Sequence, residues 1–522
     1  MLNALKYMIF VLAFNMGCVS YSLSNELPDT VTREPGVTSP LAEALKGHEG
    51  ESGFLPLIEG SDAFDARMAL ANTAVSSLDV QYYIWHRDKT GTALLSKLLD
   101  AAERGVRVRL LLDDINLGKD REFLKALDQH PLVEIRIFNP LSSDGEGLSV
   151  IARNAQLVLD FNEMNRRMHN KVFIADDSVS VIGGRNIGDE YFDLKEDRSF
   201  RDLDILAAGK VTKALSQDFD QYWNSPNAYG FHKDDEPEAK VSGAAWQAVR
   251  REQNIAKSDK PEVIFSNEPM KPMTAETIRE YKKKFIWAEA EAMADSPAIF
   301  DEKAPGLEDK IKKWPKPVSE FLVESAYFIP PDPLLKLFQD LDKKGVTIKV
   351  LTNSLQSNDV MLAHAGYMGK REEIMKSGAE LYEWRMKKVR VKTGDKGGMY
   401  ASRAGLHSKT FVIDRQYVFI GSMNLDGRSI ELNTESGLMI HSRELAKEIS
   451  AFILEGMSPE SSWKLSVDCK KDKKPCTFKN GHVVWTGKKD GKLVTYDAEP
   501  EAPFWKRSMA KFMSHLPIED KL

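Results

Sequence analysis

A duplicated strand–helix–strand unit constrains the fold of this chain more than any other feature. Residues 80–112 and 327–351 each contain a β-rich stretch, then a helical apolar pattern, then a second β-rich stretch. The matching turns Gly105-Val106 and Gly345-Val346 lie 240 residues apart. Each unit reads as a βαβ crossover, which pairs two strands in parallel and covers them with a helix. The interval is far longer than a solenoid repeat, so a whole lobe is duplicated.

A further strand follows each unit, VEIRIF in the first copy and ELYEW in the second. The pattern therefore predicts an α/β fold of two pseudo-symmetric lobes, each a mixed, mostly parallel sheet flanked by helices. The chain has 522 residues, of which 42% are hydrophobic and 29% charged, and this composition allows several sizeable cores. Between the lobes, ETIREYKKKFIWAEAEAMA is expected to be helical, within a charged insertion that shows no chemistry.

Two segments share the pattern H-x-K-x4-D-x6-G-[GS]-x-N and lie 238 residues apart, close to the interval of the duplicated lobes. Such a pattern is rare by chance, and two copies at matching places are not accidental. Residues two apart on a strand face the same side, so the His and Lys of each copy should share one face. The residues are His169, Lys171, Asp176 and Asn186 in the first copy, and His407, Lys409, Asp414 and Asn424 in the second.

Two imidazoles, two ammonium groups and two amides in one pocket would suit a phosphodiester. The ammonium groups would neutralise phosphate oxygens, and the amides would hydrogen-bond the charge that builds in the transition state. One imidazole would attack phosphorus while the other protonates the leaving alkoxide. The residues thus predict one shared active site at the lobe interface. The two motifs are too alike for their spacing to say which histidine is the nucleophile.

Each imidazole also needs an acceptor that fixes its tautomer. Asp202 and Glu435 follow the two motifs and open similar strands, so both are predicted to orient histidines, with Asp204 as a rival to Asp202. Asp176 and Asp414 fall on the opposite strand face from the lysines. We expect these two motif acids to bind backbone or neighbouring loops rather than substrate.

The N-terminus has the pattern of a secretory signal, with Lys6 followed by a short apolar run and small residues. Gly17-Cys18 resembles a lipoprotein cleavage site, which would make Cys18 a lipidation site, although Asn15 stands where an apolar residue is usual. An uncleaved anchor with an incidental cysteine is the alternative. Cys469 and Cys476 are close enough to form a disulfide in an oxidising compartment, or to remain two free thiols. A lone pair does not predict a zinc site.

The two HxKxxxxD motifs resemble those of the phospholipase D superfamily. LDVQYYIWHRDKTG, VLTNSLQSNDVMLAHAGY and the extended sequences around both motifs are similar to bacterial cardiolipin synthases of the C type. The likeness covers most of residues 53–522 and is weakest over 231–310 and around the two late cysteines. It predicts two phospholipase D-like lobes with these boundaries: 1–17, signal peptide; 18–52, linker; 53–230, first lobe; 231–310, insertion and linker; 311–460, second lobe; 461–522, hairpin and basic-aromatic tail.

The resemblance implies condensation of a phosphatidyl donor with phosphatidylglycerol to give cardiolipin, with phosphatidylethanolamine or a second phosphatidylglycerol as donor. It implies a phosphohistidine intermediate with His169 as nucleophile and His407 as general acid, then base. It implies no metal and no organic cofactor. The duplicated lobes favour a monomer, and the signal-like N-terminus favours a membrane-associated protein in the bacterial cell envelope, facing the periplasm. A requirement for an accessory protein stays open.

The tail FWKRSMAKFMSHL interleaves aromatic residues with cations, which suits a membrane interface or a helix packed on the protein's own core. His364 and Tyr367 are alternatives for pocket-lining residues and are more typical of structural positions. The net charge of −6 weighs against a nucleic-acid partner. Two rival functions remain, namely hydrolysis of phospholipid or nucleic acid on the same fold, and a non-catalytic membrane scaffold. Intact motifs in both halves argue against the scaffold.

Overall fold

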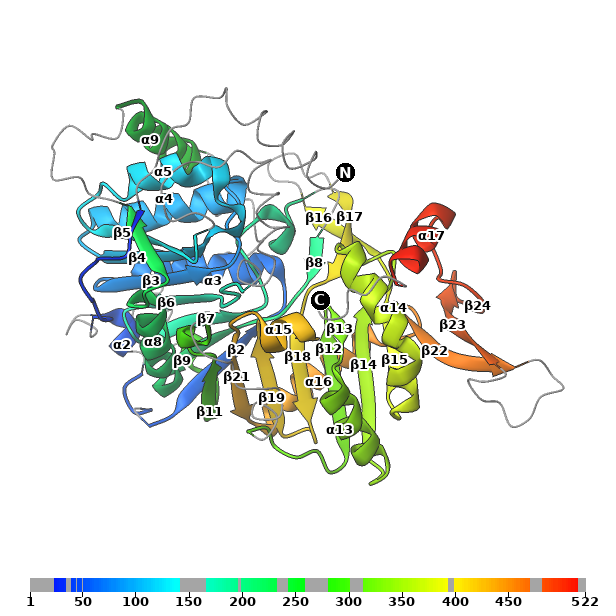
Figure 1. Ribbon diagram of the computed structural model, residues 1–522. Helices are drawn as coiled ribbons and strands as arrows, with labels where there is room; N and C mark the ends of the chain where they lie inside the picture. The colour runs from blue at the N-terminus through cyan, green and yellow to red at the C-terminus, as the bar shows by residue number, and fades with distance from the viewer. Residues whose placement is uncertain are drawn as a thin grey trace.

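The two lobes of the protein share one continuous mixed sheet (Figure 1). A computed structural model describes residues 23–33, 39–43, 45–48, 50–140, 166–195, 199–231, 243–258, 280–300, 313–392, 399–469 and 481–514. Cys18 and Cys476 lie outside these ranges, and the side chain of Cys469 is not described, so the lipidation and disulfide predictions remain untested. The described residues contain no helix that combines the length and apolarity needed to cross a membrane.

The first lobe is built on six strands in the order β5-β4-β3-β6-β7-β9. Only the pairs β3–β4 and β4–β5 are parallel, and the pairs β3–β6, β6–β7 and β7–β9 are antiparallel, so the parallel part is smaller than predicted. The strands are β3 (Ser77–Tyr82), β4 (Arg107–Asp113), β5 (Val133–Phe138), β6 (Val172–Ala175), β7 (Val179–Gly183) and β9 (Asp204–Gly209).

The second lobe repeats this order as β15-β14-β12-β18-β19-β21, with the same two parallel pairs. The predicted duplication is therefore confirmed strand by strand. These strands are β12 (Glu320–Ser325), β14 (Thr347–Asn353), β15 (Glu380–Trp384), β18 (Lys409–Ile413), β19 (Tyr417–Gly421) and β21 (Ser436–His441). Past β15 the sheet continues through β22 (Ser462–Cys469), β23 (Gly481–Lys489) and β24 (Lys492–Tyr496).

Strand β11 (Ile286–Ala294) joins the two lobes, and the predicted helix over this segment is wrong. Residues 286–288 pair with β2 (Ser52–Leu57) and residues 289–294 pair with β21, so each residue of the strand has a partner in one lobe or the other. Alanines alternate with Glu289 and Glu291, and only the glutamates are exposed. Ala and Glu favour a helix locally, but hydrogen bonding to the exposed edges of β2 and β21 outweighs that preference. Figure 1 shows β11 between β9 and β21.

Helices cover the sheet and close three large hydrophobic clusters. One cluster lies in each lobe, and the third is shared by the lobes and includes Phe219 and Trp223 of α8 with Ile449 and Ile453 of α16. This shared cluster fixes the lobes against each other. The principal helices are α3 (Gly60–Thr73), α4 (Lys89–Glu103), α5 (Arg121–Leu127), α8 (Lys210–Trp223), α9 (Gly243–Ser258), α13 (Asp332–Asp342), α14 (Met361–Lys376), α16 (Arg443–Gly456) and α17 (Phe504–Met513).

The segment predicted to be a linker before the first lobe packs against that lobe instead. Strand β1 (Leu23–Ser24) pairs with β10 (Ala228–Phe231), which itself extends the sheet beyond β5. Further along, the Thr32 backbone and hydroxyl both donate to Asp220. Pro and polar residues made the segment look like a free linker, but they also serve as extended backbone that bonds to a neighbouring surface.

Candidate active site

The two histidines of the repeated motif lie where the lobes meet, each at the entrance to a central strand. The assigned strands β6 and β18 begin just after them, at Val172 and Lys409. The His169 backbone N–H donates to the Thr434 carbonyl of the opposite lobe at 2.9 Å, and the His407 N–H donates to the Arg201 carbonyl at 2.8 Å. Each motif is therefore tied by its backbone to the segment that carries the other lobe's carboxylate.

The predicted carboxylates reach across the interface and pair with the histidine of the opposite lobe. His169 Nδ1 lies 2.8 Å from Glu435 Oε2, and His407 Nδ1 lies 2.6 Å from Asp202 Oδ2. In each pair the carboxylate accepts from Nδ1–H, which leaves Nε2 as the ring nitrogen available for chemistry. The rival Asp204 does not take this role, because it forms a buried ion pair with Arg67 at 2.8 Å.

The motif lysines and asparagines are also buried here. Lys171 Nζ donates to the carbonyl of His169 at 2.6 Å, and Lys409 donates to the carbonyl of His407. The Asn186 side-chain oxygen accepts a hydrogen bond from the backbone N–H of Ile84. Its amide nitrogen donates to the Tyr191 hydroxyl, 3.1 Å away. The Asn424 side-chain oxygen accepts from the matching backbone N–H of Tyr327. The two half-sites thus share the lysine-to-carbonyl bond and the bond that the asparagine side-chain oxygen accepts.

The crowding of cations in a buried site shifts the pKa values of these groups. Burial and then the ammonium groups of Lys171 and Lys409 hold the pKa of His169 well below its usual range. Burial lowers the pKa of Lys171 to about 7, although Glu435 opposes the shift. Burial and Lys409 also lower the pKa of His407, but Asp202 raises it in part. A bound phosphate anion would relieve this repulsion between cations.

The motif aspartates bind backbone, away from the imidazoles. Both lie in the left-handed region, with φ of 50° and 51°, at the hairpin turns β6–β7 and β18–β19. Asp176 accepts from the backbone N–H groups of Val75, Ser76 and Ser77, and Asp414 accepts from the N–H groups of residues 318, 319 and 320. Asp tolerates this conformation, and its carboxylate fastens each hairpin to the strand beside it.

Aromatic rings that the sequence did not single out surround both imidazoles. Tyr83 meets the His169 ring edge-on at 4.9 Å, while Tyr191 and Phe200 lie 5.2 and 5.1 Å from the His407 ring. Tyr83 directly follows β3, so its position at the end of a central strand was a usable signal. Tyr191 ends a short 3-10 helix (Asp189–Tyr191) and Phe200 lies in the three-residue strand β8 (Ser199–Arg201), and elements this short are not predicted by sequence patterns. Ser422, whose hydroxyl donates to Glu435, was visible as the Gly/Ser difference between the motifs.

His364 and Tyr367 are structural residues of the second lobe. The His364 side chain is fully buried, and its Nε2 lies 3.0 Å from Glu499. The Tyr367 hydroxyl donates to Glu383 at 2.9 Å. Neither residue contacts a motif side chain through these bonds.

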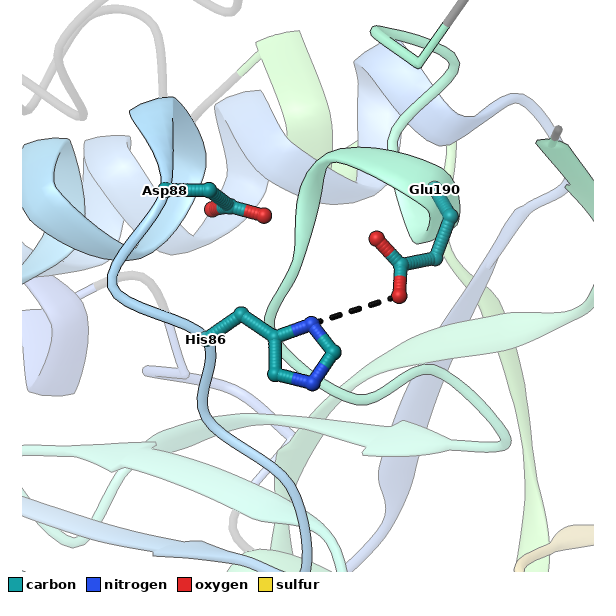
Figure 2. A group of neighbouring side chains, drawn as sticks. All are labelled: His86, Asp88 and Glu190. Atoms are coloured by element: carbon teal, nitrogen blue, oxygen red, sulfur yellow. Dashed lines mark ion pairs between the residues drawn. The ribbon is translucent and has the colours of Figure 1, made fainter. Parts of the chain in front are cut away.

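Within the described residues, one group of three side chains has a geometry compatible with a metal ion, namely His86, Asp88 and Glu190. Figure 2 shows the His86 ring facing Glu190, with which it pairs at 3.3 Å. Both Asp88 oxygens already accept hydrogen bonds, from Gly91 and Asp189 backbone N–H groups. Asp88 therefore serves as the N-cap of α4, next to the His86–Glu190 ion pair.

The same chain matches the family described as "Cardiolipin synthase, PLD-like domain" over residues 68–223 and 315–455. These two blocks coincide with the two lobes and include both HxKxxxxD motifs. The chain belongs to this family.

Relatives in sequence agree with the family. The chain is 36% identical over 496 residues to cardiolipin synthase C of Escherichia coli (strain K12), covering 93% of this chain and 99% of the relative. It is 29% identical to an uncharacterized protein of Helicobacter pylori (strain ATCC 700392 / 26695), over 98% of this chain and 99% of the relative. Among solved structures, phosphatidylserine synthase of Haemophilus influenzae Rd KW20 matches at a TM-score of 0.49 and 13% identity, covering 80% of this chain and 91% of that one.

Proposed function

We propose that this protein is a phosphatidyltransferase that condenses a phosphatidyl donor with phosphatidylglycerol to give cardiolipin. The observation that carries the proposal is the crossed pairing of His169 with Glu435 and of His407 with Asp202. This pairing holds two imidazoles in one buried site, each with Nε2 available for chemistry. Family membership and the similarity to cardiolipin synthase C support the lipid substrate.

In the first step His169 Nε2 attacks phosphorus and the bond to the leaving alkoxide breaks. The low pKa of His169 keeps this imidazole neutral, as a nucleophile must be. His407 gives its Nε2 proton to the alkoxide, and Asp202 stabilises the protonated form that this step requires. The donor headgroup leaves as a free alcohol, and a phosphohistidine remains.

In the second step a hydroxyl of phosphatidylglycerol replaces the departed alcohol. His407, now neutral, takes the proton of that hydroxyl while its oxygen attacks phosphorus and the P–N bond to His169 breaks. Lys171 and Lys409 neutralise the phosphoryl oxygens in both steps, and the amides of Asn186 and Asn424 add hydrogen bonds as charge accumulates. One chain supplies both half-sites, which supports a monomer as the active unit.

The direct test is mass spectrometry of lipids after purified protein is incubated with vesicles of phosphatidylglycerol, with and without phosphatidylethanolamine. Cardiolipin that forms with the wild type and not with His169→Ala supports the transferase, and its dependence on phosphatidylethanolamine would identify the donor. Phosphatidic acid without cardiolipin would mean that water takes the place of the lipid alcohol, which is the hydrolase. Unchanged lipids with both proteins would leave the scaffold as the better account.

We propose further that the protein acts at the membrane of the bacterial cell envelope, facing the periplasm. The support is the signal-like N-terminal sequence with Gly17-Cys18. Labelled palmitate should enter the wild type and not Cys18→Ser, and protease added to intact spheroplasts should degrade the protein. Protection from the protease would contradict the periplasmic orientation.

A further inference from the structure

Helix α17, the last described helix, exposes most of its large apolar side chains. The exposed fractions are 78% for Phe504, 65% for Trp505, 48% for Met509 and 66% for Phe512. Exposed apolar residues elsewhere in the described chain are mostly single, which is normal for a protein surface. Four of them on a helix of ten residues form a local patch that burial in the protein's own core does not explain.

The exposed large apolar side chains of α17 lie on one stripe of the helix, which also contains Ser508. At 100° per residue, Phe504, Ser508, Phe512, Trp505 and Met509 follow one another around an arc of about 140°. The opposite side carries Ala510, the buried residue of the helix. Arg507 and Lys511 border the stripe on one side, and Lys506, whose Nζ is hydrogen-bonded to the protein, borders it on the other. The helix therefore rests on the protein through its small residue and turns its aromatic stripe outward.

The surface beneath α17 leads directly to the active site. Ala510 packs with Leu355, Met361 and Met368, and Lys506 Nζ donates to the Leu355 carbonyl at 2.6 Å. Two residues earlier, the Asn353 side chain bonds the backbone of Leu406, the neighbour of His407.

A second connection runs through Asp359, which lies two residues before Met361, accepts from the Tyr327 hydroxyl at 2.8 Å and partly opposes the lowering of the pKa values of His407 and Lys409 by burial. Figure 1 shows α17 at the same end of the second lobe as β17 (Met399–Leu406), which runs into His407, and β8 (Ser199–Arg201), which runs into Asp202, and at the opposite end from α13.

We propose that α17 is an interfacial helix that seats the active-site end of the second lobe on a bilayer containing anionic phospholipid. Aromatic side chains between bordering lysine and arginine residues suit the headgroup boundary, where rings enter the acyl region and cations meet anionic headgroups. This positive charge is concentrated on the helix, since the whole chain carries a net charge of −6. This pattern favours a lipid surface over a second protein, whose interface would bury the stripe without needing cations at its borders.

The test reads the helix itself, so that attachment through the N-terminus does not interfere. Amide hydrogen exchange of residues 504–513 is measured in the full chain with vesicles of phosphatidylglycerol and phosphatidylethanolamine, and with vesicles of phosphatidylcholine alone. We expect exchange to slow about fivefold or more on the anionic vesicles and to change little on the neutral ones. Equal slowing on both, or none on either, would overturn the proposal, as would slowing without lipid at high protein concentration, which would indicate a second copy.

Variants separate the stripe from general exposure. Phe504→Ser/Phe512→Ser should abolish the slowing, and Lys511→Glu should reduce it on anionic vesicles. The matched control is Val318→Ser, which removes an apolar side chain that is 75% exposed beside the far end of β12. The control should keep the full effect. If it loses the effect as the stripe variant does, the assignment to α17 fails. Thermal melts of all variants exclude misfolding as the cause.

The role of this docking in catalysis rests on the proposed transferase function. An activity comparison distinguishes failure of the docking proposal from failure of the transferase proposal. Phe504→Ser/Phe512→Ser should lose at least about tenfold in transfer on vesicles and stay near wild type on short-chain phosphatidylglycerol dispersed as monomers. Equal activity on vesicles would contradict the docking role. A stripe-dependent change in exchange in a protein that makes no cardiolipin would uphold the docking and reject the transferase.

Discussion

The two half-sites match in their bonding and differ in how each lobe supports its carboxylate. In the first lobe Asp202 reaches His407 directly, and Gly184 stands beside it because a Cβ at that position would overlap the carboxylate. In the second lobe the longer Glu435 reaches His169, and the equivalent of Gly184 is Ser422, whose hydroxyl donates to that glutamate. The Gly/Ser difference between the motifs is therefore a consequence of the Asp/Glu difference.

The pKa values of both imidazoles are lowered, and that of His169 is lowered further. Asp202 has a pKa of about 2, held low mainly by His407 and Lys409 against the effect of burial, so it stays charged beside His407 and favours the imidazolium. The surroundings of His169 are dominated by burial and by Lys171 and Lys409, which favour the neutral imidazole. A neutral nucleophile and a protonatable acid are the two forms that the proposed first step requires.

The largest expected effect comes from the carboxylates. Asp202→Asn and Glu435→Gln should each lower kcat by about a hundredfold to a thousandfold, because an amide no longer fixes the tautomer or stabilises an imidazolium. Steady-state assays with vesicle substrate measure the loss. The Asp202 variant should recover part of its rate with a donor whose leaving alcohol is more acidic, since His407 then matters less, while the Glu435 variant should not. Equal recovery in both would remove the distinction between the histidines.

The second effect concerns stability. Asp176→Ala should lower the free energy of unfolding by about 3 kcal/mol, because three backbone N–H groups and the Ser39 hydroxyl lose a buried acceptor. Asp414→Ala should cost only about 1 kcal/mol, because its partners are largely exposed and water can replace the carboxylate. Urea titrations measure both. Similar costs would show that the two hairpins are held by something other than these bonds.

These motif residues show what the sequence could predict. The duplicated lobe, the paired motifs and the backbone role of Asp176 and Asp414 follow from periods of two and 3.6 and from residue chemistry, which act locally. The sequence does not predict which carboxylate pairs with which histidine, because this pairing across the interface depends on how the two lobes pack against each other. Strand β11 was missed for a similar reason, since its two partner edges are more than a hundred residues away in the chain.

The third effect is a pH dependence. Lys171 has a pKa of about 7 in the folded protein and an ordinary value of 10.5 when unfolded. The unfolded chain therefore binds more protons between these values, so stability rises with pH across this window and the group's cost is complete below about pH 7. In urea titrations the free energy of unfolding of the wild type should be higher at pH 9 than at pH 7. In Lys171→Met this increase should be smaller by about 2 kcal/mol. Lys409→Met should reduce this pH-dependent increase by less. An equal reduction in the two variants would contradict the asymmetry between the half-sites.

The smallest effect is that of Ser422. Ser422→Gly recreates the first lobe's arrangement around the longer carboxylate and removes one hydrogen bond from Glu435. We expect kcat to fall by less than about tenfold, in line with the loss of about 1 kcal/mol for one hydrogen bond. The reciprocal Gly184→Ser should cost more, because its side chain would overlap Asp202. A Gly184→Ser variant as active as the wild type would show that Asp202 can move without loss.

The most direct test of the central account is to locate the covalent intermediate. Phosphatidylglycerol labelled with 32P is mixed with the wild type, His169→Ala and His407→Ala, the reaction is quenched in base, and labelled peptides are mapped. We predict label on the His169 peptide in the wild type, accumulation there in His407→Ala when a donor with an acidic leaving alcohol is used, and none in His169→Ala. Label on the His407 peptide, surviving in His169→Ala, would reverse the two roles and contradict the account.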